Sequence, residues 1–181
     1  MDSFLNLVET ARSKKQDRQI KNASISHARV LVRDLLRSAI ENGEDVRIVS
    51  GCLEADFYVD LCELAQKVFD SGHTISIILE DIDMARVNNG FFDLVDQNEN
   101  GRIWEVNVNK LDYFYHFTLV SNCRYRLETN HEAKEAVANF NDTGLGQRLH
   151  DRFTNLLKIS RRVDANTGVK ATINEVAFAQ A

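Results

Sequence analysis

The stretch YHFTLVSNC, residues 115–123, places a histidine inside a run of aromatic and β-branched residues that is typical of a β-strand. A second strand-like run, RYRLE at residues 124–128, follows at once. The polar pair Ser121–Asn122 lies where the first run ends and is suited to a turn. The two runs therefore predict a hairpin that carries His116 on its first strand.

Upstream of this hairpin the pattern changes to strands that alternate with helices. We expect a strand at 46–50, a helix at about 54–70 and a second strand at 74–79, separated by Gly51 and by Ser71–Gly72. A strand, a helix and a strand within about 35 residues form a βαβ unit. Such a unit implies two parallel strands joined by a right-handed crossover.

The remaining segments complete a single α/β domain. We expect a further strand at 103–108 and helices at 3–20, 26–42, 84–95, 130–138 and 141–160. Together they predict a mixed sheet of about five strands flanked by helices. We divide the chain into an N-terminal helical extension (residues 1–22), the α/β domain (residues 23–162) and a C-terminal tail (residues 163–181).

Composition limits the classes of function. The chain has 181 residues and a net charge of −5, which disfavours general affinity for nucleic acid or for an anionic membrane. Three cysteines without framework spacing are typical of a reducing compartment. No apolar run approaches the roughly 18 residues of a membrane span, and no signal-peptide pattern is visible. We therefore expect a cytoplasmic protein without a membrane partner.

From about residue 28 to residue 159, the order of elements and the hairpin histidine resemble one half-domain of the phospholipase D superfamily. The family signature is His-x-Lys, with an Asp five residues after the Lys. Here Thr118 stands at the Lys position and Cys123 at the Asp position. The resemblance implies metal-independent phosphodiester chemistry through a phosphohistidine. It also implies a second histidine from another repeat or subunit, which is why single-repeat nucleases of the family are homodimers.

The two departures from the signature weaken that chemistry. A phosphohistidine mechanism needs cations around the phosphate, and Thr118 offers a hydrogen bond but no charge. By analogy with a lost oxyanion donor, one missing cation costs on the order of 10²–10³ in rate. Arg124 or Arg126 replaces the charge only if its side chain points at the pocket. We interpret His116 as a candidate nucleophile, or as a hydrogen-bonded structural histidine on a strand.

Two groups of charged residues are candidate anion-binding sites. Arg124, Arg126 and Glu128 share one face of the second hairpin strand, which could bind an anion or nucleic acid, or could form an exposed ion-paired face. A basic stripe on the helix at 26–42 could bind phosphates or a partner's acidic face, or could be a solvated helix face. Its members recur every four residues: Arg29, Arg33 and Arg37.

Other motifs predict no metal and no cofactor. Residues 96–101 resemble the start of a calcium loop, but Asn107 stands where the bidentate Glu should fall, so an Asn-Gly turn is the simpler interpretation. No glycine-rich phosphate loop follows Gly51, and we interpret Glu80, Asp81 and Asp83 as an acidic loop. The remaining histidines show no metal-ligand spacing: His27, His73, His131 and His150.

These observations lead to three functional hypotheses. The first is a non-catalytic phospholipase D-like binding or regulatory subunit of an intracellular microbial or phage complex, with a protein partner and self-association. The second is a divergent metal-independent nuclease or phosphodiesterase that acts as a homodimer through His116. The third is a non-catalytic nucleic-acid-binding protein that uses the arginines at 29, 33 and 37 or at 124 and 126.

Overall fold

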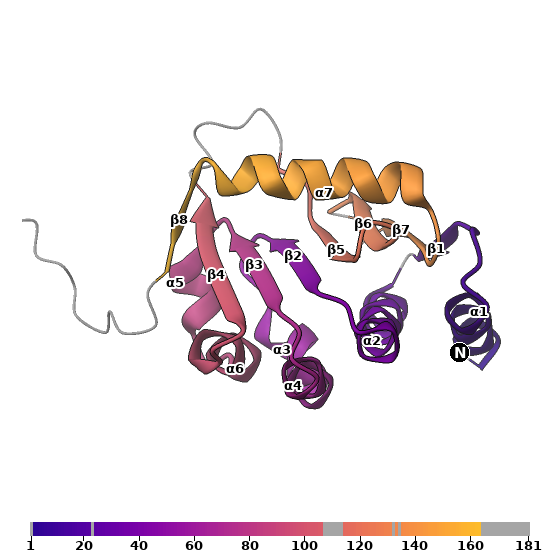
Figure 1. The fold of residues 1–181 in the computed structure, drawn as a ribbon, viewed down its shortest axis with the longest axis horizontal. Helices are drawn as coiled ribbons and strands as arrows, with labels where there is room; N and C mark the ends of the chain where they lie inside the picture. The colour runs from indigo at the N-terminus through magenta and orange to yellow at the C-terminus, as the bar shows by residue number, and fades with distance from the viewer. Residues whose placement is uncertain (1, 23, 107–113, 132, 134, 164–181) are drawn as a thin grey trace, which may run out of the picture.

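The computed structural model describes residues 2–22, 24–106, 114–131, 133 and 135–163. Within these residues one mixed sheet of eight strands has the order β1-β7-β6-β5-β2-β3-β4-β8. Helix α7 lies alone on one face, and the other helices cover the opposite face (Figure 1). The strands are β1 (Ile20–Asn22), β2 (Val46–Ser50), β3 (Ile75–Leu79), β4 (Gly101–Val106), β5 (Phe117–Val120), β6 (Arg124–Asn130), β7 (Glu135–Asn139) and β8 (Ser160–Arg162).

The helices form two layers that bury both faces of the sheet. The layer of α7 packs Leu149, Phe153 and Leu156 against the sheet, and a larger core lies under the other helices. The helices are α1 (Asp2–Ser13), α2 (Ile25–Asn42), α3 (Ala55–Tyr58), α4 (Cys62–Asp70), α5 (Ile82–Arg86), α6 (Gly90–Gln97) and α7 (Thr143–Leu157), with a 3-10 turn at Val59–Leu61. None of the helices in the described part of the chain has the length and apolarity needed to cross a bilayer.

The predicted βαβ unit and hairpin are confirmed. Strands β2 and β3 pair in parallel, with Val46 opposite Ile75, and β5 joins the other edge of β2 in the antiparallel sense. Strand β6 pairs antiparallel with β5, with Phe117 opposite Leu127. Seven of the ten residues of β2 and β3 are apolar, as suits strands covered on both faces, and this made the strands visible in the sequence.

The expected helix at 130–138 is wrong, because residues 135–139 form strand β7. The segment is rich in Ala and Glu, which favours a helix locally, but β7 lies between β6 and β1 and bonds to both. The sheet also has more than the five strands expected. Strands β1, β7 and β8 are only three to five residues long, too short to show an alternating pattern.

The N-terminal segment is integrated into the domain. Strand β1 lies at one edge of the sheet, and α1 packs on α2 with Val8 and Ala11 fully buried. The Arg12 guanidinium donates from Nε to the buried Asp34 carboxylate at 2.7 Å, which ties α1 to α2. At the other end, β8 pairs with β4, and residues 164–181 of the expected tail lie outside the described residues.

Candidate functional site

A cavity of about 500 Å³ opens where the parallel strands β2 and β3 end. Ser50 ends β2 and Gly51 follows it, and Glu80 and Asp81 follow β3, so the turns after both strands contribute to its wall. The start of β5 and the middle of β6 complete the wall on the hairpin side. Ligand sites in open α/β sheets commonly lie outside the carboxyl ends of the strands, and this volume suits a small molecule.

The hairpin that we predicted from the sequence is present and places His116 at this cavity. His116 lies just before β5, and its carbonyl oxygen accepts a hydrogen bond from the Glu128 amide at 2.9 Å, which extends the β5–β6 pairing. Its imidazole is 20% exposed and has a carboxylate near each nitrogen. Nδ1 lies 3.5 Å from Glu128 Oε1, and Nε2 lies 3.9 Å from Glu80 Oε2. His116 is therefore accessible from the cavity, but in an acidic environment.

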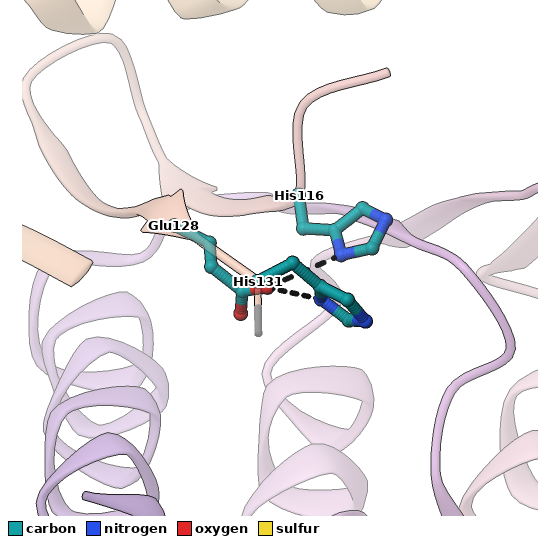
Figure 2. Close-up of side chains that lie close together, drawn as sticks. All are labelled: His116, Glu128 and His131. Carbon is teal, nitrogen blue, oxygen red and sulfur yellow. Dashed lines mark hydrogen bonds and ion pairs between the residues drawn. The ribbon is translucent and has the colours of Figure 1, made fainter. Parts of the chain in front are cut away.

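Glu128 connects two histidines. The same oxygen, Oε1, also lies 2.5 Å from Nδ1 of His131, in the turn after β6. The two imidazole rings meet edge to face, with their centroids 4.9 Å apart, and both approach the carboxylate from one side (Figure 2). Burial alone would raise the pKa of Glu128, but hydrogen bonds from both imidazoles and the nearby charge of Arg126 lower it to about 2. Glu128 is therefore an anion at physiological pH.

Thr118 and Arg126 lie directly opposite each other on β5 and β6, and both side chains line the cavity. Thr118, two residues after His116, is buried. Arg126 therefore places its guanidinium beside Thr118. The guanidinium of Arg126 already has protein partners. Its Nη2 lies 3.5 Å from Glu128 Oε2, and its Nε donates a hydrogen bond to Asn22 Oδ1 at 3.3 Å.

The charges around the cavity are mostly negative. Among the described lining residues, Arg126 is the one arginine or lysine. The lining also contains four carboxylates, and its histidines add positive charge only when they are protonated. The carboxylates come from Glu54, Glu80, Asp81 and Glu128, and the apolar part of the wall comes from Ile25, Phe57, Tyr58, Met84 and Phe117. An acidic, partly apolar cavity attracts cations rather than phosphates.

Not all the predicted site residues meet at this cavity. Arg124, Arg126 and Glu128 share a strand face, as expected, and each takes part in an ion pair, as one of the two alternatives had it. The exposure that this alternative included is wrong, because α2 packs over β6. Arg124 lies toward the far end of the strand and forms an ion pair with Glu44. Cys123 lies in the turn beside it, and its carbonyl oxygen accepts a hydrogen bond from the Asp142 amide.

The basic stripe of α2 lies outside the described wall of the cavity. The Arg29 guanidinium donates from Nη2 to the Asp56 carbonyl at 2.6 Å, and Arg37 lies 3.7 Å from the Asp34 carboxylate. Arg33 is half-buried. The stripe is therefore a second, separate surface, and two of its three cations have protein partners.

The structure adds Glu80 and His131, which sequence reasoning did not place at the site. The pairing of His116 with Glu128 could have been predicted from the hairpin, because a turn at residues 121–123 places these two residues opposite each other. His131 lies three residues beyond Glu128, in a turn that the wrongly expected helix at 130–138 concealed. Glu80 directly follows a buried parallel strand, a position that commonly contributes to ligand sites.

The calcium-loop resemblance at residues 96–101 corresponds to a turn between α6 and β4. The Asn98 side chain accepts a hydrogen bond from the Asn100 amide at 2.9 Å, and the Asn98 carbonyl accepts one from the Gly101 amide at 2.9 Å. Asn107 lies outside the described residues. The Asn-Gly turn is thus confirmed.

Comparison with known proteins identifies the fold. No protein-family model matches the sequence, and no curated protein matches it. Among solved structures, TrmBL2, an archaeal chromatin protein, superposes with a TM-score of 0.63 at 11% identity over 90% of this chain, which spans 60% of TrmBL2. Nuc from Salmonella typhimurium, a phospholipase D family member, gives a TM-score of 0.59 at 13% identity, over 81% of this chain and 99% of Nuc. NucT from Helicobacter pylori gives 0.58 at 14% identity, over 81% and 99%.

These likenesses confirm the predicted fold class. The chain has a mixed α/β sheet flanked by helices, in an arrangement similar to that of Nuc and NucT. At such low identities the agreement extends to the fold and not to the chemistry. The chemical function of the site therefore has to be inferred from the residues of this chain.

Proposed function

We propose that this protein is a phospholipase D-like binding domain that does not cleave phosphodiester bonds and serves as a binding or regulatory subunit. One observation carries the proposal: each nitrogen of His116 lies within 4 Å of a carboxylate oxygen, at 3.5 Å from Glu128 and 3.9 Å from Glu80. A phosphohistidine mechanism needs one of these nitrogens free to face the phosphorus atom, with cations around the phosphate oxygens.

Electrostatics oppose a phosphodiester in that position. At an effective dielectric constant of 20, two like unit charges 4 Å apart repel by about 4 kcal/mol. Arg126 offsets part of this repulsion, but its Nη2 is already 3.5 Å from Glu128. The same charges favour a cationic ligand, or a neutral one with an apolar part that contacts Phe57 and Tyr58. We propose that a ligand of this kind occupies the cavity.

The cellular setting is a further part of the proposal. We propose a cytoplasmic protein of a microbial or phage complex that self-associates and binds a protein partner. Large apolar side chains at the solvent surface of the α3–α5 region support such a contact, since Val59, Met84 and Val87 are 57–64% exposed. Light scattering of the purified protein tests the self-association, and a strictly monomeric protein would contradict it.

The central test is phosphodiesterase activity in a metal chelator. We expect purified protein with EDTA to show no turnover of DNA, RNA, phospholipid or a chromogenic phosphodiester above the level of the His116→Ala variant. The divergent-nuclease alternative predicts the opposite, since its chemistry is metal-independent and needs His116. Turnover in chelator that disappears in His116→Ala would overturn the proposed function.

Nucleic-acid binding is a second candidate, through the stripe of Arg29, Arg33 and Arg37 and away from the cavity. It is favoured by the structural likeness to TrmBL2, for which a mode of DNA binding is described. The net charge of −5 and the existing partners of Arg29 and Arg37 oppose it. Fluorescence anisotropy with labelled duplex DNA tests this candidate. If the protein binds DNA through this stripe, the affinity for DNA should fall steeply with salt and should be weaker in the Arg33→Ala/Arg37→Ala variant. Absence of DNA binding at low salt would exclude this candidate function.

A further inference from the structure

We propose that His116, Glu128 and His131 form a binding site for a divalent transition-metal ion, with Zn²⁺ as the best match. The described residues contain this one group of three His, Cys, Asp or Glu side chains whose ligand atoms lie within 4.8 Å of one another. The inference deepens the proposed binding role of the cavity and rests on it, because it names the cation that the acidic wall would attract.

The donor atoms are arranged as a metal would require. Two imidazole nitrogens and one carboxylate oxygen are a common ligand set for zinc sites that keep a position open for another ligand. Metal–ligand distances of about 2.0–2.1 Å place tetrahedral ligands roughly 3.3 Å apart. His116 Nδ1 lies 3.5 Å from Glu128 Oε1, close to this spacing. His131 Nδ1 lies 2.5 Å from the same oxygen and needs to move outward by less than about one ångström to reach the tetrahedral spacing.

The mobility needed for that adjustment is available at His131. Its side chain is 61% exposed in the turn after β6, whereas His116 and Glu128 are 20% and 12% exposed on the paired hairpin. Two ligands are therefore fixed by the sheet, and the third can close over an entering ion. The view in Figure 2 shows both imidazoles directed at one side of the Glu128 carboxylate.

Neighbouring side chains support the three ligands. Metal-bound histidines usually donate the other ring N–H to a carboxylate, which fixes the tautomer. Glu80 Oε2 is 3.9 Å from His116 Nε2, so that nitrogen can carry the ring proton once an ion replaces the Nδ1 hydrogen bond to Glu128. Arg126 holds the second oxygen of Glu128 at 3.5 Å, which orients Oε1 toward the histidines. The acidic wall offsets the positive charge of Arg126.

The fourth coordination position would open toward the cavity. His116, Glu128 and His131 all line the cavity of about 500 Å³, so water or a ligand atom could reach an ion held by them. An ion in this place gives the cavity an anchor for a donor atom of a small ligand. This arrangement differs from a closed structural zinc site, which has four protein ligands.

The experiment is a calorimetric titration of chelator-stripped, dialysed protein with ZnCl₂. We expect one Zn²⁺ per chain. The variants His131→Ala and Glu128→Gln should weaken binding by at least the roughly 10–100-fold that loss of a supporting partner costs. His73→Ala is the matched control, because His73 also lies 3.9 Å from a carboxylate, that of Asp45, but outside the cavity, and the affinity of this variant should equal that of the wild type. Circular dichroism checks the folding of each variant, and His131 is exposed enough for its loss to leave the fold intact.

Absence of zinc binding, or equal affinity in the wild type and His131→Ala, would overturn the proposal. Replacement of Zn²⁺ by Co²⁺ gives a second readout, because its visible absorption reports tetrahedral coordination. The spectrum should be lost in His131→Ala and kept in His73→Ala. The proposed function fails on a different measurement, the phosphodiesterase turnover in chelator. The two failures are therefore distinguishable.

Discussion

Alanine in place of Gly101 is expected to lower the free energy of unfolding by about 3 kcal/mol or more. Gly101 begins β4 immediately after the turn from α6, and a Cβ atom placed there would lie 1.7 Å from the carbonyl oxygen of Val95. That oxygen belongs to the backbone of α6, so no side-chain rotation removes the overlap. Either α6 or the start of β4 has to shift, which disturbs the pairing of β4 with β3. Urea denaturation measures the loss.

A matched control for Gly101→Ala is available at the N-terminal end of α6, the helix that precedes β4. Gly90 is the first residue of α6, and a Cβ atom there meets nothing within 4 Å. Gly90→Ala should therefore be neutral or stabilise the protein by up to about 1 kcal/mol, since alanine favours a helix over glycine. If Gly101→Ala were as stable as Gly90→Ala, the close approach of α6 to β4 would be wrong.

The elements that the sequence predicted are those whose residues carry their own pattern. Strands β2 and β3 are apolar runs ended by Gly51 and by polar residues, and the β5–β6 hairpin is joined by a short polar turn. The strand at 135–139 could not be predicted in this way. Its Ala- and Glu-rich residues favour a helix, and β7 exists because the neighbouring strands β1 and β6 supply its hydrogen-bond partners.

The candidate site was predictable to a similar extent. His116 followed from its place in the strand pattern, and the hairpin register brings Glu128 next to it. The direction of Arg126 did not follow, because strand alternation gives two faces without saying that α2 covers one of them. His131 required the turn after β6, whose geometry depends on the pairing of β6 with β7. The positions of Arg126 and His131 at the site therefore depend on contacts between segments distant in the sequence, which local sequence patterns do not reveal.

The second large effect concerns the charge of Glu128. Replacing Glu128 by Gln should lower the free energy of unfolding by about 3 kcal/mol at pH 7, and by about half as much at pH 3. In the folded protein, burial would raise the pKa of Glu128, but hydrogen bonds from His116 and His131 and the charge of Arg126 lower it from 4.5 to about 2. Each unit of difference between the folded and unfolded pKa corresponds to roughly 1.4 kcal/mol, so this lowering of the pKa accounts for the expected loss of about 3 kcal/mol.

The sign follows from proton binding. A carboxyl group with a lowered pKa in the folded state binds protons more readily after unfolding. Its stabilising effect is therefore complete above the ordinary value of 4.5 and decreases as the pH falls toward about 2. Since the neutral amide in the Glu128→Gln variant does not titrate, the difference in stability between wild type and variant should shrink over that interval. Urea denaturation of both proteins at several pH values between about 3 and 7 measures it.

Glu63→Gln provides the comparison for this pH dependence. Glu63 also has a lowered pKa, caused by its hydrogen bond from Lys67, but it lies on the solvent face of α4 with a side chain 82% exposed. Exposed pairs of this kind contribute little, so this variant should show no comparable change with pH. If Glu128→Gln behaved like Glu63→Gln, Glu128 would not be held as a half-buried anion between Arg126 and the two histidines. The acidic environment of His116, on which we base the proposed non-catalytic role and the proposed cation site, would then lose its central charge.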